Sequence, residues 1–327
     1  MTGAAHSGPM APRAAPAAQI RIGVSGWRYA PWRGSFYPND LAQARELAFA
    51  SRQFPAIELN GSFYALQRPS SYAAWSRDTP EGFVFTVKAP RFITHILRLR
   101  SPRAAIANFL ASGLLSLGPR LGPILWQLPP SLPFDAGLLE EFLALLPRDT
   151  RQGLELARER EPRMHGREWL EAEAPRWRMR HALEVRHSSF ATPECIALLR
   201  RHGVALVVAD TGDRWPELGD VTADFMYLRL HGAEALYASG YSDDRIAAWA
   251  RRVRAWNRGA APRDVELAGP AARAPASPPG GRDVFCFFDN TAKLHAPRNA
   301  LELARVLRLS PDTLRPAGRR APRPGLC

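Results

Sequence analysis

Residues 204–210 read VALVVAD and residues 225–231 read FMYLRLH, two apolar runs that each end on polar side chains. Short runs rich in β-branched, aliphatic and aromatic residues predict buried strands. Six further runs share this character: IRIGVS at 20–25, IELN at 57–60, FVFTVK at 83–88, ILWQL at 124–128, ALEVR at 182–186 and VFCFFDN at 284–290. Eight strands is the number that a closed (β/α)8 barrel needs.

Helical patterns separate most of these runs. They include LAQARELAFASRQF at 41–54, SSYAAWSRD at 70–78, PECIALLRRHG at 193–203 and DDRIAAWARRVRAW at 243–256. Strands that alternate with helices predict a parallel sheet with the helices outside it. We therefore expect an α/β fold: one (β/α)8 TIM-type barrel in a single domain over residues 20–310.

Three segments rich in Ala, Pro, Gly and Arg flank or interrupt this pattern. We expect residues 1–19 and 311–327 to be disordered tails, the second one basic, and residues 258–282 to be a flexible, disordered insertion before the last strand. The first tail lacks the apolar stretch of a signal peptide, and no apolar run reaches the ~18 residues of a membrane span. The three cysteines show no CxxC spacing. We expect a cytoplasmic protein with no membrane association.

The basic residues are almost all arginines. The net charge is +13, and of 44 basic residues only Lys88 and Lys293 are lysines. Together with the abundant Ala and Pro, this bias is typical of GC-rich coding, so the charge is weak evidence for a nucleic-acid partner. The two lysines are notable because arginine is the default cation of this chain.

Polar side chains cluster where the expected strands end. Residues two apart on a strand point the same way, and three strands carry such pairs: Glu58 with Asn60, Glu184 with Arg186, and Arg229 with His231. The other five end in Ser25, Lys88, Gln127, Asp210 and Asp289. Burying unpaired charge is costly, so a purely structural barrel would carry aliphatic residues here. The pattern predicts a small-ligand site at the C-terminal ends of the strands.

We assign roles to these residues by their chemistry. The expected catalytic residues, which can exchange protons, are Glu58, Glu184, His231 and Asp210. The expected substrate-binding residues are Ser25, Trp27, Asn60, Tyr64, Lys88, Gln127, Arg186, Arg229, Asp289, Asn290 and Lys293. For Lys88 a Schiff-base amine, a general base and a cationic anchor all stay open, with the anchor favoured. Lys293 follows the last strand, near the place where barrels often hold phosphate.

Other interpretations of the same residues remain. The carboxylates of Glu58, Glu184 and Asp210 and the cations of Arg186, Arg229 and Lys88 would also suit a neutral salt-bridge network. Glu184, Asp210, His231 and Asp289 offer metal ligands, but the nearby arginines argue against a metal, and we predict none. Aromatic residues after the first two strands suit either core packing or a wall for a flat ring. No nucleotide or dinucleotide motif is present, so no cofactor is identified.

The motifs in their order resemble one known family. They are SGWRYAPWRGSFYP at 25–38, IELNGSFY at 57–64, VKAPRFITH at 87–95, LWQLPPSL at 125–132, LEVRHSSF at 183–190, YLRLHG at 227–232 and FFDNTAKLHAPRNA at 287–300. This succession resembles the YecE-like family, catalogued as domain of unknown function 72. The resemblance implies a TIM-type barrel of unestablished activity. Asp289 stands where the family pattern usually has Asn, Gly61 replaces a small hydroxyl residue, and the 258–282 insertion is unusually long.

We therefore expect an enzyme that acts on a small polar substrate, anionic and either phosphorylated or sugar-like. Hydrolysis, lyase chemistry and isomerisation all remain open as reaction types. The alternative is a non-catalytic or nucleic-acid-associated binding module, in which the arginine-rich insertion and tail contact phosphates.

Overall fold

The structure is a computed structural model that describes residues 17–171, 175–232, 240–290 and 294–309. Residues 1–16 and 310–327, which make up nearly all of the two expected tails, lie outside the described residues.

The described part of the chain forms a closed parallel barrel in which each strand pairs with the next and β8 returns to β1. The strands are β1 (Ile20–Ser25), β2 (Ala56–Leu59), β3 (Val84–Lys88), β4 (Leu121–Gln127), β5 (His181–Glu184), β6 (Ala205–Asp210), β7 (Phe225–Leu230) and β8 (Asp283–Phe288). All eight predicted strands are confirmed, with bounds that shift by three residues or fewer. The expected single (β/α)8 barrel is therefore correct.

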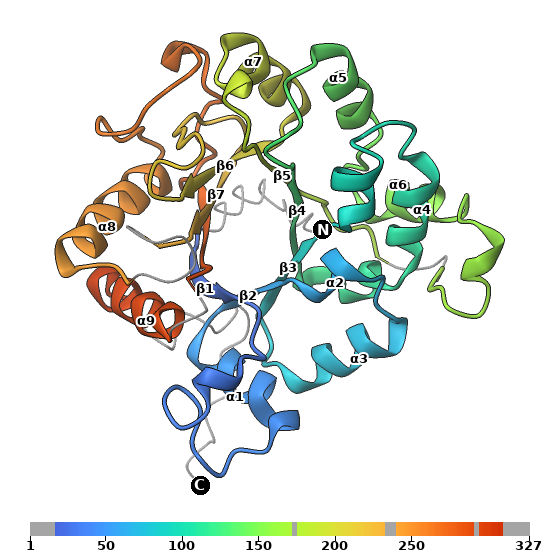
Figure 1. Cartoon of the computed structure of the whole chain (residues 1–327), viewed down its shortest axis with the longest axis horizontal. Helices are drawn as coiled ribbons and strands as arrows, with labels where there is room; N and C mark the ends of the chain where they lie inside the picture. The colour runs from blue at the N-terminus through green and yellow to red at the C-terminus, as the bar shows by residue number, and fades with distance from the viewer. Residues whose placement is uncertain (1–16, 172–174, 233–239, 291–293, 310–327) are drawn as a thin grey trace, which may run out of the picture.

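Helices surround this ring of strands (Figure 1). The α-helices are α1 (Glu46–Gln53), α2 (Gly61–Tyr64), α3 (Pro69–Asp78), α4 (Arg103–Ala111), α5 (Ala136–Ala144), α6 (Thr150–Ala157), α7 (Pro193–His202), α8 (Asp243–Asn257) and α9 (His295–Leu307). Ser242 caps α8 and Thr192 caps α7, each accepting a backbone N–H through its side chain. No helix in the described ranges is long and apolar enough to cross a membrane.

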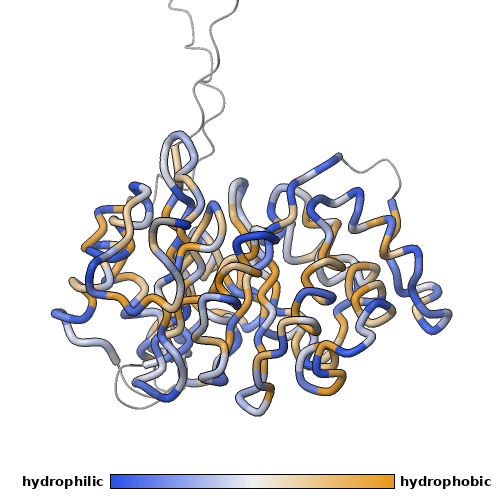
Figure 2. The backbone as a smooth tube through the Cα atoms, turned by 90° about the horizontal axis from the view of Figure 1, so that it is seen from above, coloured by the Kyte–Doolittle hydropathy of each residue, from blue (hydrophilic) through white to orange (hydrophobic). Residues whose placement is uncertain are grey.

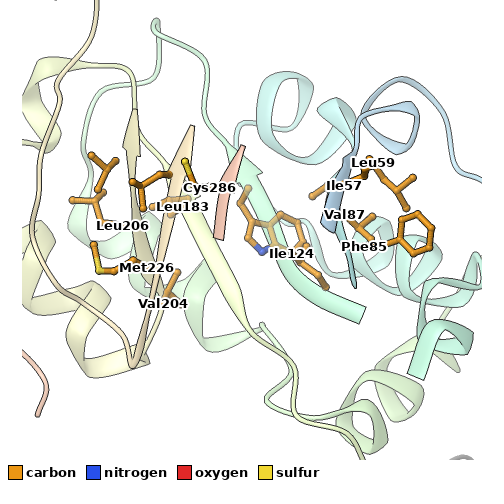
Figure 3. Packing of buried hydrophobic residues seen from close by; sticks show 14 of the residues in the cluster. Ile57, Leu59, Phe85, Val87, Ile124, Leu183, Val204, Leu206, Met226 and Cys286 are labelled. Carbon is orange, nitrogen blue, oxygen red and sulfur yellow. The ribbon is translucent and has the colours of Figure 1, made fainter. Parts of the chain in front are cut away.

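The two faces of the barrel wall pack differently. Outward-facing strand residues form a large apolar layer beneath the helices, and Figure 3 shows part of it, with Ile57, Leu59, Phe85, Val87, Leu183, Leu206 and Met226 among the labelled residues. The inner faces form a smaller apolar cluster that includes Ala56, Val207 and Phe287. Figure 2 shows hydrophobic segments through the centre and hydrophilic ones on the loops. Above the inner cluster, toward the C-terminal ends of the strands, the lining becomes polar.

One outer position of the barrel has no α-helix. Residues 211–224, which connect β6 to β7, are irregular throughout. The segment 258–282 lies over this connection, between α7 and α8 (Figure 1). Asp220 accepts hydrogen bonds from the backbone N–H groups of Ala268 and Gly269 at 2.8 and 3.0 Å, and Val265 packs on the core. The segment that we expected to be flexible is thus bonded to the barrel and covers the place of the missing helix.

A close approach between β1 and β2 depends on a glycine, and we predict that Gly23→Ala destabilises the fold. A Cβ at Gly23 would collide with the carbonyl oxygen of Ala56, its partner on β2, and would lie 3.2 Å from the Phe287 ring. Overpacking of this kind costs about 1–3 kcal/mol. The matched control is Gly137→Ala in α5, where the exposed Cβ meets only the Asp135 carboxylate at 3.5 Å. Urea unfolding should show a loss for Gly23→Ala alone, and equal midpoints would contradict the close approach.

Candidate active site at the strand ends

The polar lining comes from residues on the inward-facing positions of the strands. Ser25 pairs in register with Glu58, and Gln127 with Glu184, so their side chains leave the wall at the same height. Arg229 and His231 lie on one face of β7 and its end, and Asp289 directly follows β8. All of these side chains are buried. Strand alternation thus brings these predicted residues together in one cluster.

Arg229 is the centre of this cluster, and its side chain is fully buried. The guanidinium holds Glu58 with two N–H groups, from Nε at 3.1 Å and from the terminal NH2 group at 2.8 Å. The same NH2 group contacts Asp289 at 2.8 Å, and the other terminal nitrogen contacts Glu184 at 2.7 Å. That second nitrogen also lies 3.4 Å from Nε2 of His231. The five N–H donors of an arginine are therefore all engaged by protein acceptors.

His231 completes the network around Arg229. Its Nδ1 lies 3.1 Å from Oδ2 of Asp289. Because a guanidinium can only donate, Nε2 of His231 accepts from Arg229, and this assigns the ring proton to Nδ1, facing Asp289. Both ring nitrogens thus face protein groups.

The three carboxylates differ in their remaining partners. Glu58 also accepts from Ser25 at 2.8 Å and from the hydroxyl of Tyr227 at 2.7 Å. Glu184 also accepts from Gln127 and from Nε of Arg186, both at 2.8 Å. The Asp289 carboxylate contacts only Arg229 and His231 among the described residues.

Burial and charge act in opposite directions on these carboxylates. Burial by itself would raise the pKa of Glu184, but Arg186 and Arg229 more than offset it and hold the pKa well below its usual range. At Asp289 burial is likewise outweighed, by Arg229 and then by His231, and the pKa falls to about 2. For Arg229, burial opposes the charge, whereas Glu58, Asp289 and Glu184 raise the pKa well above its ordinary value. At neutral pH Glu184, Asp289 and Arg229 are therefore charged, and Arg229 pairs with both carboxylates.

Lys88 ends β3 in the same polar layer but is held differently. Its side chain is 8% exposed, and its ammonium lies 4.2 Å from the centre of the Phe63 ring. Within the described residues it makes no hydrogen bond or ion pair. Burial, and then Arg229, lower the pKa of Lys88 to about 8, with partial compensation from the three carboxylates.

Two hollows open beside the cluster at the same end of the barrel. Arg186, which shares the inner face of β5 with Glu184, lines a cleft of about 550 Å³ together with His187, Arg214 and Trp215. The Arg186 guanidinium stacks on the Trp215 ring at 3.8 Å. Burial, followed by repulsion from Asp210, raises the pKa of Glu217 in this cleft to about 7. The cleft therefore carries both signs of charge.

The second hollow measures about 290 Å³ and lies between the loops that follow β1 and β2. Trp27, Tyr29, Trp75 and Asn60 are among its lining residues. The Asn60 side-chain oxygen is buried and accepts no hydrogen bond from the described residues. The aromatic residues after β1 thus lie in two different places. Trp32 is fully buried in the core, whereas Trp27 and Tyr29 line this hollow. Tyr64, also a predicted ligand contact, is 74% exposed on α2.

Two predicted site residues lie elsewhere. Asp210 projects from the outer face of β6, because Val207 and Ala209 occupy the inner one. Its carboxylate accepts from Trp249 of α8 at 3.2 Å and does not join the carboxylates around Arg229. Asn290 points toward α9 and donates to the Asn299 side chain at 3.1 Å. The prediction that Asp210 shares the polar inner face is therefore wrong, and Asn290 lies outside the cluster around Arg229.

The described residues do not bring the possible metal ligands together. In the described ranges no three His, Cys, Asp or Glu side chains are grouped so as to hold a metal ion. The ligand set that includes Asp210 does not converge, since that carboxylate faces α8. Lys293 lies outside the described residues.

The sequence analysis missed four contributors. Tyr227 and Thr86 lie one step deeper on the inner faces of β7 and β3, and the Tyr227 hydroxyl donates to Thr86 at 3.0 Å as well as to Glu58. Both are two residues before a predicted site residue, so strand alternation points to them. Phe63 of α2 contacts Lys88, and Trp215 of the β6–β7 connection contacts Arg186. No sequence spacing indicates these two contacts.

We predict that Arg229→Met is strongly destabilising, because it leaves three buried carboxylates without their common partner. Breaking a buried ion pair on one side costs about 3–5 kcal/mol. The control is Arg103→Met, which removes an exposed guanidinium from a surface pair with Glu159 and should change little. Chemical denaturation at pH 7 measures both. Similar small losses in the two variants would mean that the Arg229 network contributes no net stability.

The lowered pKa values predict a loss of stability in acid. Asp289 and Glu184 have native pKa values below their unfolded ones, so their contribution is fully present above the unfolded value of ~4 and is lost as the pH falls toward 2. Asp289→Asn removes one of these groups. The variant should therefore lose less unfolding free energy between pH 5 and pH 3 than the wild type does. Equal slopes in urea titrations would show that Asp289 is not held below its usual pKa.

Comparison with known proteins places the chain. The family model described as "Protein of unknown function DUF72" matches residues 21–324. Among curated proteins, the chain is 34% identical over 116 residues to UPF0759 protein YunF of Bacillus subtilis, a match that covers 34% of this chain and 40% of that protein. It is 30% identical over 138 residues to UPF0759 protein YecE of Escherichia coli, covering 42% of this chain and 48% of that one. These matches span less than half the length of the curated relatives.

Solved structures of similar fold agree with this placement. A crystal structure of a DUF72 family protein from Thermotoga maritima has a TM-score of 0.62 at 24% identity, and covers 88% of this chain and 99% of that one. A DUF72 family protein from Enterococcus faecalis has a TM-score of 0.61 at 17% identity, over 89% of this chain and 96% of its own. At such identities the likeness concerns the fold alone. With the family model matching nearly the whole chain, the protein belongs to the DUF72 family.

Proposed function

We propose that this protein is an enzyme that binds a small anionic substrate at the C-terminal ends of its strands, with Lys88 facing the substrate. The observation that carries the proposal is the state of Lys88. A buried cation is costly unless a counter-charge is near, and among the described residues none is paired with this ammonium. An anionic group of a bound substrate would supply that charge.

The hydrogen bonds around Arg229 limit which of the two strand-end arginines can bind a substrate. Since Arg229 has no N–H left to donate, it serves as a positioning residue that fixes Glu58, Glu184 and Asp289. The predicted use of Arg229 as an anion anchor is therefore replaced by this positioning role in our proposal. Arg186 is the arginine at the edge of the cluster, because its guanidinium also lines the 550 Å³ cleft.

Among the carboxylates around Arg229, Glu184 is the one that we favour as a proton acceptor, although its lowered pKa makes it a weak base. It lies between the buried network and the cleft, in contact with Arg229 on one side and with Arg186 on the other. Glu58 accepts four hydrogen bonds from Ser25, Tyr227 and Arg229, which leaves its two oxygens little capacity for a substrate. The volume of the cleft suits a small molecule, and its lining offers Arg186 and Arg214 to an anionic group, although Asp213, Glu217 and Glu266 also line it.

The test is a thermal-shift screen of the wild type, Lys88→Met and Arg77→Met at constant ionic strength. Arg77 is exposed in the last turn of α3 and supplies the matched loss of one positive charge away from the strand ends. The probes are inorganic phosphate, glucose 6-phosphate and citrate. A ligand at 100 times its Kd stabilises by about 2.7 kcal/mol. We expect at least one anion to raise the Tm of the wild type and of Arg77→Met, with a smaller rise in Lys88→Met.

Two results would count against the proposal. One is the absence of any shift in the wild type, and the other is a shift of equal size in Lys88→Met. Binding that depends steeply on salt and persists in Lys88→Met would instead favour a binding module that uses arginine-rich surfaces.

A further inference from the structure

Lys88 combines burial with an aromatic cover. Its stem lies in the inner face of β3, and Phe63 of α2 lies over its ammonium at 4.2 Å. The His95 ring packs edge-on against Phe63, with the ring centres 5.2 Å apart. His95 belongs to the helical turn η3 (Phe92–Ile96), which follows β3. The amine thus lies against the Phe63 ring and within the electrostatic field of the charged network.

The neighbouring carboxylates are already committed to other cations. Glu58, Glu184 and Asp289 each accept hydrogen bonds from Arg229, and Glu184 accepts another from Arg186. A lysine meant as a permanent structural cation would be expected to pair with one of them. Lys88 instead stays outside the paired network, within its field but without a direct contact.

The residue type is also informative. Of the 44 basic residues in the chain, 42 are arginines, and Lys88 is the lysine that the described structure buries at the strand ends. Arginine would supply a cation with more donors, but its guanidinium does not lose its proton in proteins. A lysine amine, in contrast, becomes a nucleophile when it is desolvated beside another cation.

Resting on the proposed function, we propose that Lys88 is an amine nucleophile that forms an imine with a small aldehyde or ketone bearing an anionic group. The nitrogen lone pair adds to the carbonyl carbon, and one N–H proton passes to the former carbonyl oxygen. The resulting hydroxyl then leaves as water with the second N–H proton as the C=N bond forms. No oxidant, reductant or further reactant is needed for this step.

The electrostatic surroundings agree with this role. Burial and then Arg229 lower the pKa of Lys88 to about 8, while Asp289, Glu58 and Glu184 oppose the shift. A substantial fraction of the amine is therefore neutral near pH 8. Burial and then Lys88 itself lower the pKa of His95 to about 4, so the imidazole is neutral at pH 7. The neutral imidazole therefore adds no further positive charge beside the Lys88 amine.

The experiment uses the scarcity of lysine in this chain. The full-length protein is incubated separately with pyruvate, glyoxylate and dihydroxyacetone phosphate, and imines are reduced with sodium cyanoborohydride. Intact mass and peptide mapping then locate each adduct among Lys88, Lys293 and the terminal amine. We expect one adduct per chain at Lys88 with at least one probe. The trapping rate should increase with pH, with the midpoint of the increase near pH 8, because the amine loses its proton there. Lys88→Arg should lose this adduct, and Lys293→Arg should retain it.

Peptide mapping of the wild type gives the answer even if Lys88→Arg fails to fold. Adducts confined to Lys293 or the terminal amine, or no adduct with any of the three probes, would overturn the imine role. If anions still raise the Tm through Lys88 in that case, the proposed anion site stands and Lys88 is an electrostatic anchor. If no adduct forms at Lys88 and no anion raises the Tm through Lys88, both the proposed function and the imine role are wrong.

Discussion

The arrangement of the whole strand-end layer depends on one buried guanidinium. Arg229 receives three carboxylates from three other parts of the barrel wall, and its remaining donor meets His231. Charges buried at this depth are tolerable only when they are mutually satisfied. The positions of Glu58, Glu184 and Asp289 are therefore set by a common partner rather than by three separate contacts. This leaves Lys88 and Arg186 as the basic side chains at the margin of the network.

The fold was accessible from the sequence because each strand is a compact apolar run and the helices between them are amphipathic. The sequence predicts which residues belong to the site only on strands whose two faces differ clearly in polarity. On β7, polar and apolar residues alternate, so Arg229 and His231 could be placed on the inner face. On β6 both faces are apolar, and nothing in VALVVAD tells which one Asp210 shares. Contacts made by segments between the strands, such as Phe63 on Lys88 and Trp215 on Arg186, depend on tertiary packing that no local spacing encodes.

The amino-acid composition is more informative about the site than about the binding partners of the chain. The arginine bias makes the net charge a poor guide to binding partners, yet the same bias makes a lysine informative. Gly61 begins the short helix α2 that places Phe63 over Lys88. Asp289 contributes a carboxylate to the Arg229 network.

The segment 258–282 covers a part of the sheet that a helix covers elsewhere in the barrel. Val265, Ala268 and Ala274 pack against the apolar layer on the outside of the wall, and Asp220 holds the backbone beside them. The outward side chains of β6 and β7, including Leu206, Val208 and Leu228, belong to that same layer. Trimming this Ala- and Pro-rich stretch as dispensable would uncover an apolar sheet face to solvent. Solubility of the isolated chain, rather than catalysis, is therefore what this segment protects most directly.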